Sequence, residues 1–410
     1  MTRFSLTARW VLPIDEAPLE GGVVTVENGT IVDVAAHSTD ARQAQDLGEV
    51  VLLPGLVNAH THLEFSQHSV PLGTPDMTLP DWIRLVIADR KRAGRDSNES
   101  VTTGLRESLS GGVVALGNIA TSALSDKSRT VPRLLQFQEV IGFSAARLES
   151  SLAELQQRLN TCHDSKPTPS SPAQGISPHA PYTVHPHLLG RLVDEAISRE
   201  LPVAMHLAES PEELELLSHG TGSFRDLLEE RSMWDATAIS LGTTPLDYLR
   251  ILARAPRAIV VHGNYLSSAE IEFLARKSIR MSVVYCPRTH EYFQHARYPL
   301  REMLSAGVRV AFGTDSRASN PDLSLFGEMR CAARLHRLSP TEVVRMATLT
   351  GAEVLGWDTM IGSIRPGKRA DLIAVPCEAP DPAEAVLECE GPPTHVWVGG
   401  QPEIPAQSSM

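Results

Sequence analysis

Short runs rich in Val, Ile and Leu recur along the middle of the chain, and most of them precede a stretch with helical spacing. Runs of this length, bounded by turn residues, are typical of buried parallel strands. The helical part is clearest between residues 185 and 200, where apolar residues recur at near 3.6-residue spacing. Eight such units in about 300 residues match the size of a (β/α)8 TIM barrel, an α/β fold. The predicted strands are Val50–Ala59, Val113–Gly117, Leu134–Val140, Gly175–Pro178, Pro202–Leu207, Ala258–Val261, Arg280–Tyr285 and Val308–Gly313.

Both ends of the chain show a different pattern, in which apolar and polar residues alternate between tight turns. The pair Asn28-Gly29 separates two alternating segments and predicts a hairpin. Neither end has enough strands for a stable sheet of its own, so we expect the two ends to pair into one small β domain. The predicted units are residues 1–52 and 361–410 for the two halves of this β domain and residues 53–360 for the barrel.

The composition is that of an ordinary globular protein, with 42% hydrophobic and 21% charged residues among 410. This composition excludes disorder as the main state of the chain. Acidic residues outnumber Lys and Arg by 49 to 37, which gives a net charge of −12. Because no Lys/Arg-rich stripe accompanies this acidic balance, we expect no nucleic-acid partner.

Signals for secretion and membrane insertion do not stand out in this sequence. The first ten residues lack the apolar region of a signal peptide, and no window approaches the ~18 apolar residues of a membrane helix. The five cysteines are scattered and form no C-x-x-C motif, which is typical of reduced thiols. We therefore expect a cytoplasmic protein without a membrane partner.

Residues that can bind a metal or transfer protons gather at the ends of the predicted strands. In a (β/α)8 barrel these ends meet at one mouth, where function resides. A single histidine there is more often a packing residue, but several such residues at one mouth favour a site, because buried imidazoles and carboxylates must be paired or bind metal. The residues are His60, His62, His179, His206, Glu209, His262 and Asp315.

Three imidazoles and one carboxylate suit a borderline divalent ion, Zn²⁺ above all, with Fe²⁺ as the alternative. Such an ion lowers the pKa of a bound water towards ~7. Glu209 directly precedes Ser210-Pro-Glu-Glu213, which predicts a helix N-cap with a capping box and places Glu209 at the strand-to-helix corner as a proton carrier. The predicted direct ligands are His60, His62, His206 and Asp315.

These motifs resemble the amidohydrolase superfamily in its mononuclear-metal deaminase branch. The resemblance rests on His60-Thr-His62, His206-x-x-Glu209, Val-His262-Gly and Gly-Thr-Asp315-Ser, and on segments 346–356 and 362–372. It implies a barrel with a β-sandwich made from both termini. It also implies that Glu209 shuttles protons, that His262 hydrogen-bonds the attacking hydroxide, and that Asp315 both binds the metal and accepts a proton from the attacking water.

The resemblance also implies one metal ion rather than two. Binuclear members bridge two metals with a carboxylated lysine at the end of the fourth strand, where this chain has Gly175-Ile-Ser-Pro-His179. This argues against an enzyme of the hydantoinase or phosphotriesterase type. In the mononuclear branch, His206-x-x-Glu209 implies hydrolytic removal of ammonia from an aromatic C–NH₂ group, and the same scaffold also removes chloride from triazines.

A narrower resemblance is to the aminodeoxyfutalosine deaminases of menaquinone synthesis. Their substrates carry a 6-aminopurine, a ribose-derived spacer and a benzoate. The resemblance implies that His179 and Trp82 contact substrate, whereas Glu139 either contacts it or braces the third strand. Arg288 is the predicted partner of the substrate carboxylate, because guanidinium binds carboxylate bidentately; the alternative is an exposed surface arginine. The motifs are 62–66, 138–142, 286–288 and 314–320.

Two positions depart from the related S-adenosylhomocysteine/methylthioadenosine deaminases. Those enzymes place an acidic ribose-binding residue about nine positions after the helical tryptophan, whereas this chain has a cation there and Asp89 out of register. Arg317 replaces an expected apolar residue. We therefore expect a deaminase of an aminopurine nucleoside-like substrate, aminodeoxyfutalosine first. The alternatives are an adenosine, S-adenosylhomocysteine or guanine deaminase, a triazine chlorohydrolase, and an inactive barrel that acts as a binding protein. Relatives are often dimers, so a homodimer is the oligomer to test.

Overall fold

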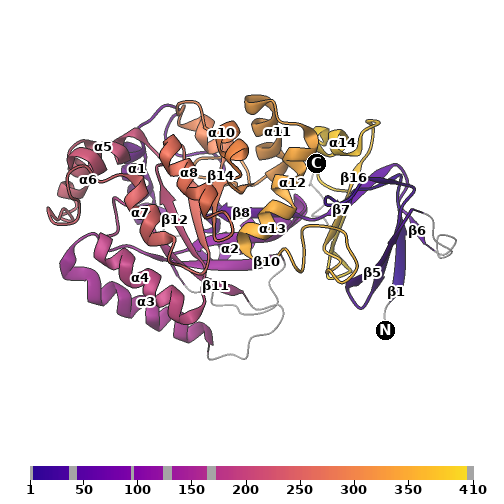
Figure 1. The fold of residues 1–410 in the computed structure, drawn as a ribbon, viewed down its shortest axis with the longest axis horizontal. Helices are drawn as coiled ribbons and strands as arrows, with labels where there is room; N and C mark the ends of the chain where they lie inside the picture. The colour runs from indigo at the N-terminus through magenta and orange to yellow at the C-terminus, as the bar shows by residue number, and fades with distance from the viewer. Residues whose placement is uncertain (1–2, 37–43, 94–96, 123–131, 164–171, 404–410) are drawn as a thin grey trace.

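The structure is a computed structural model that describes residues 3–36, 44–93, 97–122, 132–163 and 172–403. Its centre is an eight-stranded parallel sheet in the order β8 to β15, curved into a nearly closed barrel (Figure 1). This confirms the predicted α/β barrel. The strands are β8 (Leu56–Thr61), β9 (Val113–Ala120), β10 (Arg133–Val140), β11 (Ala173–Pro178), β12 (Val203–Leu207), β13 (Ala258–His262), β14 (Met281–Tyr285) and β15 (Val310–Phe312).

Helices between the strands cover the outside of the barrel, as Figure 1 shows. Several begin with a proline in the first turn, and α4 places an apolar face with Leu188 and Leu192 against the core. The helices are α1 (Leu79–Ala93), α2 (Ser97–Ser110), α3 (Leu148–His163), α4 (Pro186–Arg199), α5 (Pro211–His219), α6 (Ser223–Glu230), α7 (Pro245–Leu252), α8 (Ser268–Arg276), α9 (Pro287–Tyr292), α10 (Leu300–Ala306), α11 (Leu325–His336), α12 (Pro340–Ala347), α13 (Leu349–Leu355) and α14 (Pro382–Glu388), with short 3-10 turns η2 (Leu63–Phe65) and η3 (Ala145–Arg147).

The first and last barrel strands meet at their carboxyl ends. Thr61 and Asp315 form a parallel bridge. The backbone N–H of His62 donates to the carbonyl oxygen of Asp315 at 3.1 Å, and that of Thr314 donates to the carbonyl oxygen of His60 at 3.0 Å. Two segments that carry predicted metal ligands are therefore joined by their backbones.

The predicted first strand, Val50–Ala59, is two strands in the structure. β7 (Val50–Pro54) pairs with a terminal sheet, and β8 begins at Leu56 in the barrel. Gly55 separates them, and a Cβ at this position would lie 2.2 Å from a methyl carbon of Val114. The chain can change sheets here because glycine lets its backbone approach β9 closely.

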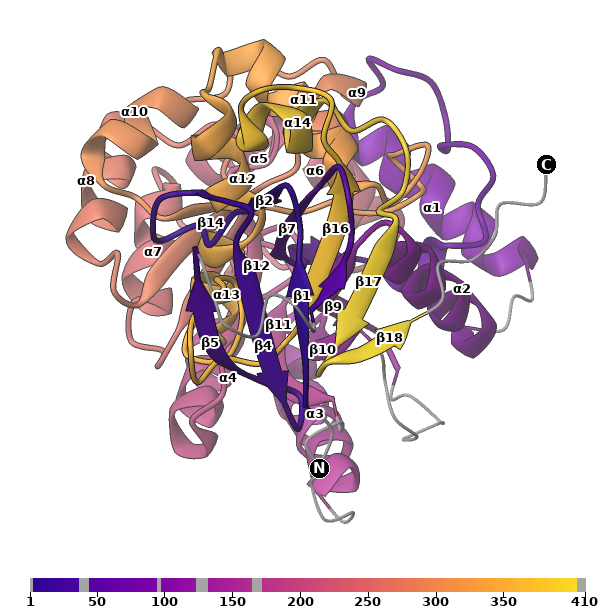
Figure 2. The same ribbon diagram turned by 90° about the vertical axis from the view of Figure 1, so that its right-hand side faces the viewer.

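The two ends of the chain build two further sheets beside the barrel, as Figure 2 shows. One has the order β5-β4-β1-β6, and the other has the order β18-β17-β16-β7-β2-β3. A shared apolar core joins them, with Leu6 and Val24 from the first and Leu52 and Leu372 from the second. The strands are β1 (Arg3–Thr7), β2 (Trp10–Val11), β3 (Leu19–Glu20), β4 (Val23–Glu27), β5 (Thr30–Ala35), β6 (Gln45–Asp46), β16 (Leu372–Pro376), β17 (His395–Val398) and β18 (Gln401–Glu403).

These sheets confirm the predicted small β domain made from both termini. β16 runs antiparallel to β7, so strands more than 300 residues apart in the sequence are neighbours. The hairpin predicted at Asn28-Gly29 joins β4 to β5, and both residues have positive φ, 50° and 80°. The boundaries at residues 52 and 361 stay a prediction, and β7 runs across the first of them.

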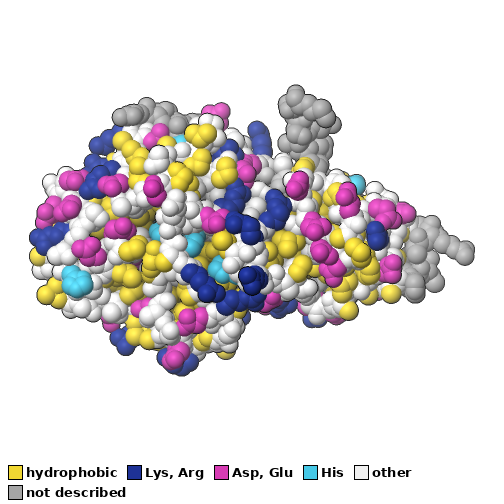
Figure 3. All heavy atoms as spheres, turned by 90° about the horizontal axis from the view of Figure 1, so that it is seen from above, with side chains coloured by type: hydrophobic (Ala, Val, Ile, Leu, Met, Phe, Trp, Pro, Cys, Tyr) yellow, Lys and Arg dark blue, Asp and Glu magenta, His cyan; other side chains and the backbone are white. Residues whose placement is uncertain are grey.

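The surface carries charges of both signs. On the face drawn in Figure 3, acidic and basic side chains lie next to one another over the larger part of the molecule. No helix within the described ranges combines the length and the apolar character needed to cross a membrane. Four cysteines have free thiols and are buried: Cys286, Cys331, Cys377 and Cys389.

Candidate active site

A cavity of about 460 Å³ opens at the carboxyl ends of the barrel strands. Its inner end is polar, and five of the predicted site residues line it there: His62, His206, Glu209, His262 and Asp315. His60 lies behind them with 1% of its side chain exposed. The structure thus brings together ligand-type residues that are up to about 250 positions apart in the sequence, because parallel strands present their carboxyl ends at one mouth.

The four predicted ligands place their donor atoms close together. Nε2 of His62 lies 3.2 Å from Nε2 of His206, and Oδ1 of Asp315 lies 3.6 Å from Nε2 of His60 and 3.7 Å from Nε2 of His62. Tetrahedral zinc, with bonds of about 2.0–2.2 Å, places neighbouring ligand atoms about 3.3–3.6 Å apart. The donor set therefore has the spacing of a mononuclear metal site.

The protonation states of these histidines also suit a metal. Burial lowers the pKa of His60 and of His62 well below the usual value, and it lowers the pKa of His206 to about 4. Neutral imidazoles offer the lone pair that a metal requires. Nε2 of His60 is buried and has no hydrogen-bond partner within the described residues. A cation at this point would satisfy it.

Neighbouring groups orient two of the ligands. Nδ1 of His206 lies 2.9 Å from the carbonyl oxygen of His179, so Nδ1 carries the proton and Nε2 keeps its lone pair for the centre. Oδ2 of Asp315 accepts a hydrogen bond from Oγ of Ser319 at 3.0 Å, which leaves Oδ1 towards the histidines. Both contacts hold the ligand atoms in place before any ion binds.

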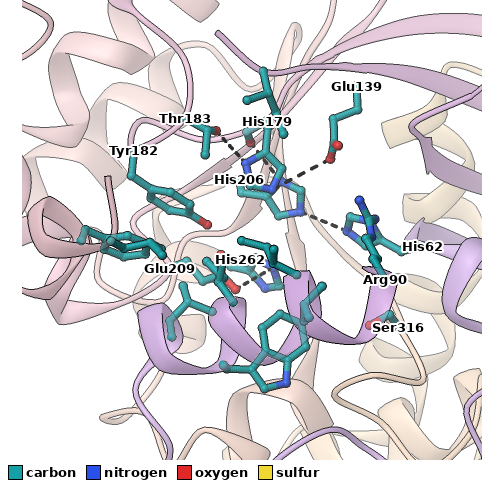
Figure 4. Close-up of a pocket in the computed structure, with 18 of the residues that line it drawn as sticks. His62, Arg90, Glu139, His179, Tyr182, Thr183, His206, Glu209, His262 and Ser316 are labelled. Atoms are coloured by element: carbon teal, nitrogen blue, oxygen red, sulfur yellow. Dashed lines mark hydrogen bonds and ion pairs between the residues drawn. The ribbon is translucent and has the colours of Figure 1, made fainter. Parts of the chain in front are cut away.

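A second trio also has donor spacing. Ring nitrogens of His60, His206 and His262 lie within 4.8 Å of one another. Nε2 of His262, however, is 3.3 Å from Oε1 of Glu209, so these two side chains lie within ion-pair distance of each other. His262 is thus engaged with the carboxyl group beside the donor set, as Figure 4 shows.

Glu209 lies at the corner between β12 and α5. The preceding Ala208 has a φ of 53°, and Ser210 caps the helix by accepting a hydrogen bond from the backbone N–H of Glu213. The predicted capping box is only half formed. The carboxylate of Glu213 accepts instead from the backbone N–H groups of Ala208 at 2.8 Å and Glu209 at 2.9 Å, because the left-handed residue turns both groups towards it. These two hydrogen bonds fix the backbone conformation of the corner.

The carboxyl group of Glu209 is 8% exposed. Its pKa is raised well above the usual value, first by burial and then by the negative charges of Asp315 and Glu213. A raised pKa means that this carboxyl readily holds a proton near neutral pH. Asn264 donates to the carbonyl oxygen of Glu209 at 2.8 Å, and Tyr298 donates to that of His262 at 2.8 Å, so both backbones are anchored.

Replacing Glu213 with glutamine tests this anchoring. Glutamine has one acceptor oxygen instead of two, so one of the two buried backbone N–H groups loses its partner. We expect the free energy of unfolding to fall by about 1–3 kcal/mol and kcat to fall with it, measured by urea unfolding and steady-state kinetics. Glu212→Gln, at the neighbouring position in the first turn of α5, is the matched control. Equal stability of both variants would contradict the anchoring role.

Three of the four predicted substrate-binding residues line the same cavity: Trp82, Glu139 and His179. Nδ1 of His179 forms a hydrogen bond with Oγ1 of Thr183 at 2.7 Å. Nε2 of His179 lies 3.9 Å from Oε1 of Glu139, as drawn in Figure 4. Burial lowers the pKa of His179 to about 4 and raises that of Glu139. Glu139 thus faces the cavity rather than only bracing its strand.

Arg288 does not line this cavity, which corrects the expectation that it meets a substrate carboxylate. It lies in the first turn of α9. Nη1 of Arg288 is 2.7 Å from Oδ1 of Asp322, and its Nε is 3.8 Å from Oε1 of Glu328. Packing between α9 and α11 therefore directs the guanidinium towards carboxylates of the protein.

Arg317 and Asp89, the two positions that depart from the related deaminases, both contact His68. Arg317 donates to the carbonyl oxygen of His68 at 2.7 Å and pairs with Glu107 at 2.7 Å. Asp89 pairs with Nε2 of His68 at 3.0 Å. Neither Arg317 nor Asp89 lines the cavity. Arg90, the neighbour of Asp89, does line it.

Sequence reasoning missed several lining residues. Arg90 follows Trp82 by eight positions, or two helical turns, and this spacing is the signal that would have placed both on one face of α1. The others lie in or next to α6 and in the segments after β11 and α9; they include Tyr182, Phe224, Arg231, Met233 and Phe293.

The sequence profile of the amidohydrolase family matches residues 51–402, most of the chain. The chain belongs to the amidohydrolase family. A 5-methylthioadenosine/S-adenosylhomocysteine deaminase of Desulforudis audaxviator is 31% identical to this amidohydrolase over 398 residues, which cover 90% of the chain and 84% of the relative.

Two solved structures show the same fold. An adenosine deaminase of Xanthomonas campestris with bound zinc has a TM-score of 0.77 at 27% identity and covers 98% of this amidohydrolase and 92% of its own chain. Helicobacter pylori aminofutalosine deaminase with methylthio-coformycin has a TM-score of 0.83 at 23% identity and covers 98% and 100%. The protein is therefore a hydrolase of a family whose deaminase members act on C–N bonds other than peptide bonds.

Proposed function

We propose that this protein is a metal-dependent aminohydrolase that removes ammonia from the 6-aminopurine of a nucleoside-like substrate. One observation carries the proposal. The Glu209–His262 pair lies beside a mononuclear donor set at the inner end of a cavity large enough for a small organic ligand. Relatives whose names state purine-nucleoside deamination support the choice of substrate class.

The metal proposed is one Zn²⁺ ion held by His60, His62, His206 and Asp315, with Fe²⁺ as the alternative. Three neutral nitrogens and one carboxylate fit either ion, and the orphaned Nε2 of His60 supports a cation at this place. When bound, such an ion activates water as a nucleophile at neutral pH.

The protein's own residues then manage the protons. Asp315 accepts a proton as water attacks the amine-bearing ring carbon, and His262 donates a hydrogen bond to the attacking oxygen. Glu209 gives its proton to the adjacent ring nitrogen, takes up the remaining proton of the attacking oxygen, and passes that proton to the departing amine. Asp315 then returns its own proton to Glu209, which restores both groups. The C–O bond forms, the C–N bond breaks, and ammonia leaves with the proton that Glu209 relayed.

The substrate proposed first is aminodeoxyfutalosine, which places the enzyme in menaquinone synthesis in the cytoplasm. His179, Trp82 and Glu139 would contact the purine and the spacer, since all three line the cavity. Trp82 presents a flat apolar face suited to an aromatic ring, and its Nε1 is buried without a hydrogen-bond partner in the described residues.

The test is ammonia release by the zinc-loaded protein from four amines side by side. They are aminodeoxyfutalosine, adenosine, S-adenosylhomocysteine and guanine. Turnover of aminodeoxyfutalosine at the highest kcat/KM would support the proposal in full, whereas turnover of another purine would keep the chemistry and replace the substrate. Chloride release from a chlorotriazine with no ammonia from any amine would favour the chlorohydrolase alternative. Ligand binding without either product would favour a binding protein.

A further inference from the structure

A group of buried polar side chains adjoins the proposed metal ligand Asp315 and has no part in the proposed mechanism. Burial of such groups is costly unless they find hydrogen-bond partners, so their partners indicate what they do. None of them lines the cavity. They are Thr289 on α9, Ser319 and Asn320 in the segment after β15, and Glu328 on α11.

Two hydroxyl groups connect this cluster to the carboxylate of Asp315. Oγ of Ser319 donates to Oδ2 of Asp315 at 3.0 Å, and Oγ1 of Thr289 lies 3.0 Å from Oγ of Ser319. Because Ser319 gives its one proton to the carboxylate, the contact between the two hydroxyls uses the proton of Thr289. Nδ2 of Asn320 in turn donates to Oγ1 of Thr289 at 3.3 Å. Every donor of this chain therefore points towards Asp315.

The proton of Ser319 has a competing acceptor. The carbonyl oxygen of Ser316 lies 3.3 Å from Oγ of Ser319, against 3.0 Å for Oδ2 of Asp315. The hydrogen bond from Thr289 strengthens the donation to the charged acceptor, because hydrogen bonds in a chain polarise one another. Thr289 thus favours the contact with Asp315 over the contact with the carbonyl oxygen.

Asn320 and Glu328 hold the far end of the chain. Nδ2 of Asn320 donates to the carbonyl oxygen of Thr314 at 2.6 Å and to Oε1 of Glu328 at 3.1 Å, so the amide nitrogen is held on this side. Oε2 of Glu328 accepts from the backbone N–H of Arg288 at 2.9 Å. Glu328 therefore joins Asn320 to the backbone directly before Thr289.

The orientation of the Asp315 carboxylate depends on such a contact. The χ2 torsion of an aspartate has a broad energy minimum, so its own bonds orient the carboxylate only weakly. A hydrogen bond to Oδ2 restricts this rotation. It keeps Oδ1 facing the histidines, at 3.6 Å from Nε2 of His60 and 3.7 Å from Nε2 of His62.

We propose that Thr289 is a positioning residue for the metal ligand Asp315: its hydroxyl directs the proton of Ser319 to Oδ2 and thereby keeps Oδ1 oriented for the ion. Asn320 and Glu328 hold Thr289 in this role. The inference rests on the proposed function, because Asp315 is a ligand of the metal proposed there. It concerns metal binding and requires no contact between Thr289 and substrate.

The test is the Zn²⁺ affinity of Thr289→Val, which keeps the shape of the side chain and lacks the hydroxyl. We expect its dissociation constant, measured by competition with a chromophoric chelator, to rise by about 10- to 100-fold, as for other partners of metal ligands. Thr289→Ala should show the same loss, whereas Thr289→Ser, which restores the hydroxyl, should retain most of the affinity. The visible absorption of the Co²⁺-loaded protein should change in Thr289→Val, since its bands report ligand geometry.

A double variant tests whether Thr289 acts through Ser319. Ser319→Ala should itself weaken Zn²⁺ binding, and Thr289→Val added to it should cause little further loss, because the chain is already broken. Full additivity of the two losses would mean that Thr289 acts by another route, and this would overturn the inference.

Thr348→Val is the matched control, because it also removes a buried hydroxyl, one that donates to the carbonyl oxygen of Val344 at 2.6 Å. Both valine variants lose one buried hydrogen bond, so urea unfolding of the metal-free proteins should show similar losses of stability. Only Thr289→Val should lose Zn²⁺ affinity. Equal Zn²⁺ affinity of the two variants would show a merely structural role and overturn the inference.

These readouts separate the inference from the proposed function. Unchanged Zn²⁺ affinity of Thr289→Val, together with ammonia release by the wild type, would overturn the inference and keep the function. Weakened Zn²⁺ binding by Thr289→Val, with no ammonia released by the wild type from any of the four amines, would keep the inference and overturn the function. Absence of Zn²⁺ binding by the wild type would overturn both.

Discussion

Glu209→Gln is expected to lower kcat by at least about 10²–10⁴-fold, the usual contribution of a positioned general acid–base group. Glutamine keeps the size of the side chain and can still hydrogen-bond His262, whose Nε2 lies 3.3 Å from the carboxyl oxygen. It cannot carry a proton to the ring nitrogen or to the departing amine. The loss should therefore fall on kcat, with little change in KM, in a steady-state ammonia assay.

The same substitution should leave the fold intact and change the pH dependence of stability in the metal-free protein. Burial raises the pKa of Glu209 well above its usual value of 4.5, so the stability that this carboxyl contributes is complete below that value and is lost as the pH rises. Glutamine does not titrate, so the free energy of unfolding of the variant does not fall with pH for this reason. Its free energy of unfolding relative to wild type should therefore increase with pH above about 4.5.

Glu212→Gln, which removes a carboxylate three residues further along, controls for the change in charge. It should retain wild-type kcat. If Glu209→Gln kept more than about a tenth of the wild-type kcat, another group would have to carry the proton, and the proposed role of Glu209 would be wrong.

Removal of the metal is the second change with a large expected effect. Protein dialysed against a chelator should lose turnover, because activation of water is lost with the ion, and added Zn²⁺ should restore it. The ion binds the folded state only, so its removal should also lower the midpoint of thermal unfolding. Elemental analysis should find one divalent ion per chain.

His206→Ala extends this experiment to a single ligand. We expect the variant to bind less than one equivalent of metal and to release no ammonia, since Nε2 of His206 is 3.2 Å from Nε2 of His62 in the donor set. His187→Ala is the matched control, because this histidine is exposed and lies away from the cavity. Two ions per wild-type chain would contradict the mononuclear site, and full activity without metal would contradict the mechanism.

The barrel and the positions of the proposed ligands could be predicted because both depend on local order along the chain. Apolar runs and helical spacing mark the alternating elements, and a residue at or just past the carboxyl end of a strand must lie at the barrel mouth. His60, His206 and Asp315 follow this rule. The split of the first strand at Gly55 was missed, because a run of apolar residues does not show that the chain changes sheets.

Substrate-facing residues on helices were harder to assign. Arg288 follows a strand, yet the packing of α9 against α11 and the segment before it pairs this arginine with Asp322. Arg90 follows no strand, and its side chain reaches the cavity because the packing of α1 sets the rotation of that helix about its axis. Sequence distance says nothing about this rotation, since it depends on contacts with Phe65 and other residues far from the helix in the chain.

The sequence alone determined that this protein is an α/β barrel with a histidine-rich mouth and a terminal β domain, since periodicity and strand-end position are local properties. The tertiary structure alone decided how the donor atoms are spaced, that Glu213 supports the corner at Glu209, and which arginine meets the cavity. Each of these depends on distances between elements that only the packed core sets.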